Sequence, residues 1–562
     1  MRVALILLPL LLVGAAPKQT DPFVALSEAY RTRDATAAGA MYSSSATVVY
    51  RYDGAPEERH VGTTAITRSF RRLFDQIEPG ERVDLNFRFV VRKGTEGTGL
   101  YRLRIGSGVT SYGRFSVTFG PDGRFLSDTS TSATLADFES ARGPILIRPE
   151  DETIDREYYA QMTGRYRLPD GCALIVTRSV VRLFVRNSCT NEWRGLNRLS
   201  GREWTAGDYV RSDTSRRTIS FPGTGVALRM EIVEGERRMT ATRDDVYRTE
   251  DIGFQSADGT ELRGTVYLPV GGERRQQRAA SVLIHGSGPQ DRDGYASIIA
   301  VMADELAANG RIVLTFDKRG SGRSVGDGDR AGFDTLADDA IAAMRALAAR
   351  PDVAPGRIGI AGSSQAGWVA ARAVQRYPDV ADVMLLGAAG SALTVVEQNL
   401  YNTEVRMRCA GVARTDIDLA LRQQQAFFAF LANPAQAPTL DALTRTGRSR
   451  PGLADWLFPD SASTNRTGGQ WYTVLEPQFD PRPVWRQFGG TKLFLFSQFD
   501  DSTPTQVALT RSRADGAQVR MLRGAQHLGL STTSVCRGEL TDLQAFSPAL
   551  FREMASFARP TR

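Results

Sequence analysis

Residues 357–377 read RIGIAGSSQAGWVAARAVQRY, and this stretch decides the fold of the chain around it. An apolar run of strand length comes first, small residues then surround two serines, and an amphipathic run of helix length follows. This order predicts a strand, a sharp turn and a helix, with a serine held at the turn. The backbone of such a turn is strained and closely packed, so it needs small residues two positions before and two positions after the serine.

The need for small flanks favours Ser364 over Ser363. At these positions Ser364 has Gly362 and Ala366, whereas Ser363 would have the bulky Gln365 on one side. A serine that merely caps a helix is the alternative interpretation, but the apolar strand before it and the amphipathic helix after it favour a nucleophile. Ser364 is therefore the predicted nucleophile.

Further apolar runs around this turn predict a mostly parallel, doubly wound sheet covered by helices on both faces. They are residues 280–286, 311–317, 357–363, 383–388 and 492–498. Residues from about 395 to about 486 break the alternation of strands and helices, which predicts a lid inserted before the last two strands. The sequence therefore predicts an α/β fold for residues 250–562, and we expect this part to fold without the preceding residues.

A serine hydroxyl needs a base, and the base needs an acid that orients it. The chain contains three histidines, His60, His285 and His527. His527 follows the final apolar strand and precedes the C-terminal helix, so it is the predicted base. His285 opens a glycine-rich loop, where we expect a structural role.

The acid and the oxyanion donors follow from neighbouring strand ends. Asp500 ends the run KLFLFSQFD, four residues before a proline, so it is the predicted acid, with Asp501 as its solvated neighbour. A developing oxyanion needs two fixed N–H donors. We expect one from the backbone of Gln365 and the other from the backbone of Ser287 or Gly286.

The stretches HGSGPQDRDG, FDKRGSGRS, GSSQAGW, FDDSTP and AQHLG together resemble the serine hydrolases of the α/β-hydrolase superfamily. The likeness is to bacterial esterases and to dienelactone-hydrolase-like and prolyl-oligopeptidase-like catalytic domains. It implies a Ser-Asp-His triad at Ser364, Asp500 and His527, although Ala366 replaces the usual glycine. In FDKRGSGRS, the resemblance suggests that Asp317, Arg319 and Gly320 shape the loop at the carboxyl edge of the sheet, and we expect them to be scaffolding.

The sequence before residue 250 predicts a secretory signal and two further domains. Residues 1–16 have one arginine before an apolar run too short to span a bilayer, followed by small residues, which predicts a cleaved secretory signal. Residues 21–143 show helices and then antiparallel strands, an order that resembles the nuclear transport factor 2-like (SnoaL-like) cone. Residues 155–248 contain short strands and turn signals, which predict a small all-β barrel or sandwich.

The cysteines and the charge of the chain bear on its disulfides and on whether it binds nucleic acid or metal ions. Four cysteines allow three disulfide pairings. Two apolar strand runs lie between Cys172 and Cys189 and can pair as a hairpin, so we predict a disulfide between these two cysteines. By elimination, Cys409 should then pair with Cys536. The net charge is +7, but the arginines are scattered among acids, which argues against nucleic-acid binding. Cysteine spacing and the few histidines predict no metal and no cofactor.

The sequence thus predicts an exported serine hydrolase, secreted or periplasmic and without a membrane span, which cleaves esters of small acyl substrates. A serine aminopeptidase or acyl-peptidase acting on a peptide-like substrate is the alternative, because the same triad cleaves amides. A third interpretation is a binding or scaffolding protein with a vestigial hydrolase. The sequence leaves the oligomeric state open.

Overall fold

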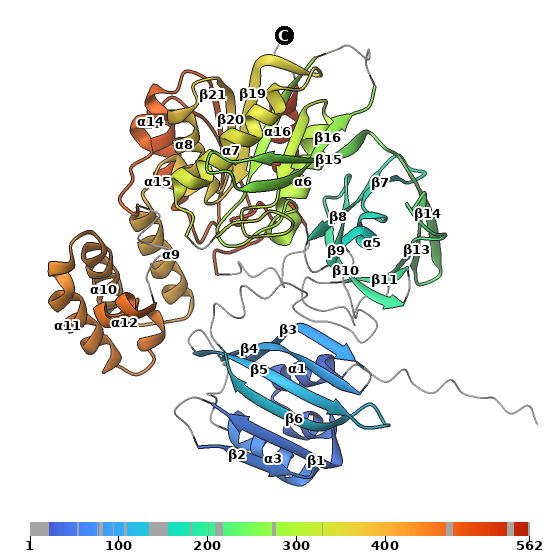
Figure 1. The fold of residues 1–562 in the computed structure, drawn as a ribbon, viewed down its shortest axis with the longest axis vertical. Coiled ribbons are helices and arrows are strands. Elements are labelled where there is room, and N and C mark those ends of the chain that lie inside the picture. Colours follow the sequence, from blue (N-terminus) through green and yellow to red (C-terminus); the bar gives the residue numbers. More distant parts are fainter. Residues whose placement is uncertain are drawn as a thin grey trace, which may run out of the picture. The chain divides into compact units, whose positions relative to one another are not determined.

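A computed structural model describes residues 22–52, 56–75, 77, 83–93, 95–105, 109–133, 156–179, 182–200, 202–207, 217–271, 277–328, 330–467, 476–536 and 545–559. These residues fall into two compact units, the first made of the described residues up to 133 and the second of those from 156 onward (Figure 1). The predicted secretory signal lies outside the described residues. Among the described helices, none combines the length and the apolar character that a membrane crossing needs.

The first unit packs helices on a six-stranded sheet in the order β2-β1-β6-β5-β4-β3. Its helices are α1 (Pro22–Thr32), α2 (Ala35–Ala40) and α3 (Thr63–Phe74), and its strands are β1 (Tyr42–Arg51), β2 (Glu58–Val61), β3 (Val83–Lys93), β4 (Glu96–Ile105), β5 (Val109–Phe119) and β6 (Phe125–Ser132). Its core is aromatic, with Phe23 within 5.2 Å of both Phe115 and Phe125 between ring centroids. The likeness to a nuclear transport factor 2-like cone stays a prediction.

The second unit begins with α5 (Arg156–Ala160) and a closed eight-stranded barrel. Its strands are β7 (Gly164–Arg167), β8 (Ala173–Ser179), β9 (Arg182–Asn187), β10 (Trp193–Ser200), β11 (Glu203–Gly207), β12 (Arg217–Ser220), β13 (Arg229–Glu234) and β14 (Arg237–Arg243). Trp204 and Tyr166 fill the interior with other buried apolar side chains. A disulfide joins Cys172 to Cys189 at the ends of the β8–β9 hairpin.

An eight-stranded sheet follows, in the order β15-β16-β18-β17-β19-β20-β21-β22. Its strands are β15 (Tyr247–Gln255), β16 (Glu261–Pro269), β17 (Arg278–Ile284), β18 (Ile312–Phe316), β19 (Val353–Ser363), β20 (Val380–Leu386), β21 (Thr491–Ser497) and β22 (Gln518–Leu522). The strands from β17 to β22 pair in parallel, while β15 and β16 are antiparallel. The predicted α/β fold with a mostly parallel sheet is confirmed for this part of the chain.

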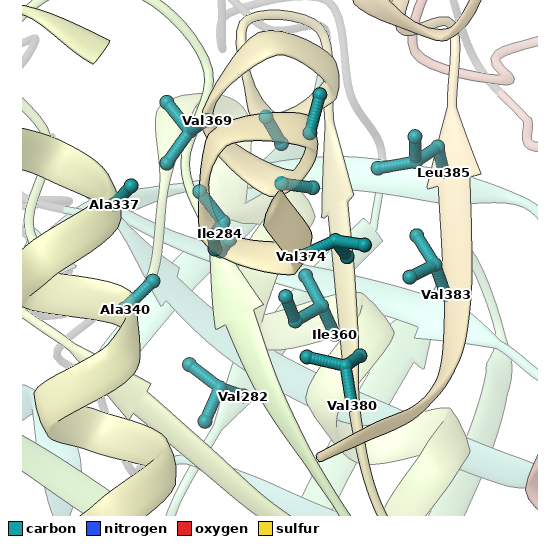
Figure 2. Close-up of a cluster of buried hydrophobic side chains, with 14 of the residues drawn as sticks. Val282, Ile284, Ala337, Ala340, Ile360, Val369, Val374, Val380, Val383 and Leu385 are labelled. Atoms are coloured by element: carbon teal, nitrogen blue, oxygen red, sulfur yellow. The ribbon is translucent and has the colours of Figure 1, made fainter. Parts of the chain in front are cut away.

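Helices cover this sheet on both faces, because its strands are apolar on both. The helices are α6 (Ile298–Ala308), α7 (Phe333–Ala348), α8 (Ala366–Arg376), α15 (Thr505–Ala514) and α16 (Pro548–Ala558). Val282 and Ile284 of β17 belong to the apolar cluster with α7 and α8, while Leu283 between them belongs to the cluster with α6 and α16. Figure 2 shows the first cluster, in which the α7 and α8 side chains face β17 and β19.

The barrel and this sheet share an apolar core. Trp193 of β10 stacks on Phe184 with 4.7 Å between ring centroids and meets Phe546, just before α16, edge-on at 5.6 Å. Arg165 of β7 donates to the buried Asp304 of α6 at 2.8 Å. This packing differs from our expectation that residues from 250 onward fold alone, because without the barrel these apolar and acidic groups would lose their partners.

Residues 395 to 486, which we call the insertion, lie between β20 and β21, and five α-helices begin in the part of this segment that the structure describes. They are α9 (Val395–Cys409), α10 (Arg414–Ala432), α11 (Ala437–Arg448), α12 (Ser461–Thr467) and α14 (Arg482–Gln487). Phe427 and Phe428 of α10 pack on Phe458 in a small core of the insertion's own. That the insertion covers the site as a lid stays a prediction.

Candidate active site

Ser364 stands at a strained turn between β19 and α8. Its φ is +56°, in the left-handed region that side chains other than glycine rarely adopt. Its backbone N–H donates to the carbonyl oxygen of Leu386, at the end of β20, at 3.0 Å. Ser363, in contrast, is the last residue of β19 and is 2% exposed. The two serines therefore differ in backbone conformation and position, and that Ser364 is the nucleophile stays a prediction.

The packing around the turn explains why its flanks are small. A Cβ atom added at Gly362 would lie 2.5 Å from the Cβ of Ala366 and 2.6 Å from the carbonyl oxygen of Ile284 on β17. Real Cβ atoms do not approach other atoms this closely. β19 and the start of α8 can therefore pack this closely only with glycine at position 362, whereas an alanine fits at position 366.

Asp500 and His527 form a hydrogen-bonded pair beyond the ends of β21 and β22. His527 Nδ1 lies 2.9 Å from one carboxylate oxygen of Asp500 and 3.0 Å from the other. Asp500 is 1% exposed, and its Oδ1 also accepts from the backbone N–H groups of Ser502 and Thr503, each at 2.8 Å. An ionised carboxylate only accepts, so Nδ1 carries the proton and Nε2 is left free to accept one.

The charge state of His527 reflects opposing effects. Burial favours the neutral ring and lowers its pKa, while the charge of Asp500, the hydrogen bond to it and the charge of Asp501 raise it. Together, the two carboxylates raise the pKa by more than burial lowers it, so the pKa of His527 lies above its ordinary value. His285 differs, because burial, followed by the charge of Lys318, lowers its pKa to about 3 and keeps its ring neutral.

Ser364 and His527 both contact the end of β20, at the adjacent residues Leu386 and Gly387. Ser364 bonds to Leu386, and a Cβ added at the next residue, Gly387, would lie 3.2 Å from His527 Nδ1. Within the described part of the chain, no hydrogen bond joins the Ser364 hydroxyl to the imidazole. Bonds of this kind often tighten only when substrate is bound.

The predicted oxyanion donors lie next to the turn. The Cβ position of Gly286, just after β17, is 3.4 Å from Ser364 Cβ. Neither the backbone N–H of Gln365 nor that of Ser287 donates to any group that the structure describes. Two N–H groups are thus available near the serine.

Lys318 joins these two donor segments, and the sequence interpretation passed over it. Its Nζ lies 3.1 Å from the carbonyl oxygens of Gly286 and Gly288 and 2.8 Å from Oε1 of Gln365. The sequence signal was a lysine directly after a buried strand, inside FDKRGSGRS. The neighbour Asp317 is fully buried and accepts from the backbone and side chain of Arg292, so it is scaffolding.

The insertion reaches the acid through α9. Tyr401 donates from its hydroxyl to the carbonyl oxygen of Asp500 at 2.9 Å, and the amide of Asn402 donates to that of Asp501 at 2.9 Å. At the end of the same helix, Cys409 is bonded to Cys536, beyond His527. The first helix of the insertion is thus fastened to the segments that carry acid and base.

Comparison with known proteins gives a family match for part of the chain. The sequence model described as serine aminopeptidase, S33 (Hydrolase_4) matches residues 275–415, less than half of the chain. This stretch contains Ser364 but neither Asp500 nor His527. No curated protein matches the chain. The match supports an α/β-hydrolase fold for this part of the chain and a hydrolase activity for the protein.

Solved structures of α/β hydrolases and esterases are also similar. They include the α/β hydrolase GrgF from Penicillium sp. sh18 (17% identity, 50% of this chain and 91% of that chain, TM-score 0.33) and the esterase EaEST from Exiguobacterium antarcticum (15%, 49% and 91%, TM-score 0.30). Est1E from Butyrivibrio proteoclasticus, with ferulic acid bound, is a third (14%, 54% and 96%, TM-score 0.33). At such low identities and TM-scores, no activity is carried over from them.

Among the described residues, no group of three or more His, Cys, Asp or Glu side chains is arranged to hold a metal ion.

Proposed function

We propose that the protein is a serine hydrolase that cleaves ester bonds of small acyl substrates through an acyl-enzyme intermediate. The observation that carries the proposal is the strained turn of Ser364 beside the hydrogen-bonded pair of His527 and Asp500. A strained turn of this kind holds a serine hydroxyl free of the helix that follows. The pair supplies a proton acceptor whose ring is fixed from behind by a buried carboxylate.

In the acylation step, Nε2 of His527 takes the hydroxyl proton of Ser364 while Oγ attacks the ester carbonyl carbon. The carbonyl oxygen becomes an oxyanion, which accepts from the backbone N–H groups of Gln365 and of Ser287 or Gly286. When the carbon–oxygen bond of the ester breaks, His527 gives its proton to the leaving alkoxide. An alcohol departs, and the acyl group stays on Ser364.

In the deacylation step, water takes the place of the alcohol. His527 removes a proton from the water, whose oxygen attacks the acyl carbon, and the same oxyanion donors act again. Collapse of this intermediate returns the proton to Ser364 and releases the carboxylic acid. Asp500 keeps the ring in one tautomer throughout and stabilises its charged form.

We propose that the protein works outside the cytoplasm, secreted or periplasmic. The two disulfides, Cys172 with Cys189 and Cys409 with Cys536, support this location, because such bonds persist in oxidising compartments.

A serine aminopeptidase or acyl-peptidase is the second candidate, favoured by the family match described as serine aminopeptidase. The two candidates share the nucleophile and differ in the leaving group. A series of p-nitrophenyl esters of increasing acyl length, measured beside aminoacyl anilides, separates them. Faster turnover of the anilides would replace the esterase assignment with the peptidase.

The nucleophile itself is tested with a fluorophosphonate, which labels activated serines. We expect labelling of the purified protein, no labelling of Ser364→Ala, and most of the labelling retained in Ser363→Ala. Equal loss in both variants would remove the basis for choosing Ser364. If the unaltered protein reacts neither with the probe nor with any ester or anilide, the protein is a binding or scaffolding protein with a vestigial hydrolase.

A further inference from the structure

Lys318 is a buried ammonium behind the proposed oxyanion hole. It follows β18, is 7% exposed, and has no ion pair among the described residues. Its three hydrogen bonds go to neutral acceptors that belong to two separate segments, the glycine-rich loop after β17 and the residue after the nucleophile. Burying an ammonium without a counter-ion costs stability. We propose that Lys318 is a positioning residue that holds both oxyanion donors in place; this inference rests on the proposed serine hydrolase function.

The bond to Gly286 fixes the first donor. In a trans peptide the carbonyl and the N–H of the same unit point in opposite directions. Because Lys318 Nζ holds the Gly286 carbonyl oxygen at 3.1 Å, the N–H of Ser287 is directed away from the lysine. The second bond, to the Gly288 carbonyl, fixes the loop on the other side of Ser287. The Ser287 N–H thus keeps one direction before substrate arrives.

The bond to Gln365 fixes the second donor. Its side-chain Oε1 accepts from Lys318 at 2.8 Å, and the residue is 2% exposed, so both its side chain and its backbone are held. The backbone N–H of Gln365 stays without a partner among the described groups. One ammonium therefore connects the two donors that arise far apart in the sequence. Donors fixed beforehand are what lowers the barrier at an oxyanion hole.

A second lysine in the same sheet offers a matched control. Lys492, at the start of β21, is also 7% exposed and donates to two carbonyl oxygens, Trp485 at 2.7 Å and Phe488 at 3.0 Å. It lies at the end of β21 opposite to Asp500. Burial and carbonyl bonds are therefore common to both lysines, and only Lys318 contacts the proposed donors.

The experiment compares Lys318→Met with Lys492→Met. We expect the melting temperature to change in the same way in both, because each variant loses the cost of a buried ammonium and leaves two carbonyl oxygens without its hydrogen bonds. Lys318→Met should lower kcat for p-nitrophenyl acetate by about 10- to 100-fold with KM changed less than about threefold, because ester binding survives and oxyanion stabilisation does not. Lys492→Met should keep kcat within about twofold. Equal kcat values in the two variants at temperatures where both are folded would overturn the inference.

If Lys318→Met does not fold, Gln365→Met tests the same connection from its other end. It keeps the backbone donor and removes one acceptor of Lys318, so kcat should fall by a smaller factor, about three- to tenfold. An unchanged kcat in Gln365→Met would overturn the inference. Fluorophosphonate labelling separates the two levels: absence of labelling in the unaltered protein defeats the proposed function, whereas normal labelling with unchanged kcat in Lys318→Met defeats only the role of Lys318.

The pH dependence supplies a readout that a merely structural lysine would not change. Burial lowers the pKa of Lys318 to about 8, although the charge of Asp339 on α7 opposes it. His285, which also faces Lys318, stays neutral over this range because its pKa is about 3. We expect kcat of the unaltered protein to fall above about pH 8, as Lys318 loses one donor. The same fall in Lys318→Met would contradict the inference.

Discussion

At the scale of single residues, His527 has two requirements that conflict. It must be neutral to accept the proton of Ser364, yet Asp500 at 2.9 Å favours its charged form and raises its pKa. The charged pair contributes stability that is fully present below the ordinary histidine pKa of about 6.5 and is lost as pH rises through the raised value. We expect activity to appear in the pH range where this contribution disappears.

Asp500→Asn tests this relation. Removing the carboxylate leaves burial, which lowers the pKa of His527, so the midpoint of kcat/KM against pH should move to lower pH. The maximal rate should fall by about 10⁴-fold, because the amide does not hold the required tautomer. Asp501→Asn should shift the midpoint in the same direction but less. A midpoint unchanged in Asp500→Asn would contradict the assignment of Asp500; fluorophosphonate labelling at a series of pH values measures it.

The single residues also show what the sequence could and could not predict. The choice of Ser364 over Ser363 followed from the size of its flanks, and the structure gives the left-handed backbone at Ser364 alone of the two. Lys318 was missed because its partners are two backbone carbonyls and one amide, which carry no sequence signature. The distance between Ser364 and His527 also depends on loops that strand patterns do not fix.

At the scale of elements, the close packing of β19 and α8 around Ser364 requires that residue 362 has no side chain. Gly362→Ala would place a methyl group 2.6 Å from the carbonyl oxygen of Ile284, so the strand or the helix must shift. We expect a loss of about 1–3 kcal/mol of stability and loss of fluorophosphonate labelling. Gly489→Ala is the control, since nothing lies within 4 Å of its Cβ position. Normal labelling of Gly362→Ala would contradict the claim that the packing around Gly362 leaves no room for a methyl group.

The disulfide at the end of α9 gives a second test at this scale. The bond between Cys409 and Cys536 spans 127 residues, and the one between Cys172 and Cys189 spans 17. In the chain-entropy model these loops contribute about 5 and about 3 kcal/mol. We expect Cys409→Ala/Cys536→Ala to lose activity at temperatures where it stays folded, because α9 is released from the segment after His527.

Cys172→Ala/Cys189→Ala, altered in the barrel hairpin, should keep its activity at the same temperatures. Activity and thermal melting of both double variants are the measurements. Equal specific activities well below the melting range would show that the bond of α9 acts on global stability alone.

Regular elements were easier to predict than their connections. The apolar runs that predicted the parallel sheet are β17, β18, β19, β20 and β21 of the structure, because strands buried on both faces need continuous apolar sequence. The contacts of α9 with Asp500 and Asp501 had no such signal, since a tyrosine and an asparagine on a helix face are common at any surface.

At the scale of the molecule, the barrel and the α/β sheet belong to one compact unit. Trp193 and Phe184 are buried in the cluster that contains α6 and α16, and Arg186 lies between Asp304 and Glu305 of α6. Arg178 of β8 also donates to Asp293, in the segment that connects the glycine-rich loop with α6. The sequence could not reveal this interface, because its residues are ordinary barrel and helix residues until they are packed together.

Truncation tests the interface. We expect residues 156–562 to be soluble and labelled by the fluorophosphonate, and residues 250–562 to be insoluble, because the latter expose the apolar partner surface of Trp193 and leave Asp304 without its arginines. Size-exclusion chromatography and labelling of both fragments are the measurements. A soluble, labelled fragment of residues 250–562 would show that the barrel is dispensable for the fold.

The bond between Cys409 and Cys536 also makes a closed covalent ring of the chain between them. Asp500 and His527 are on this ring, whereas Ser364 precedes it. A protease that cuts the backbone once within the ring opens it without separating any part from the molecule, and a second cut is needed before a peptide is released. A chain cut once would migrate as one species on a gel without reductant and as two with it. A single cut within the ring thus stays hidden until the disulfide is reduced.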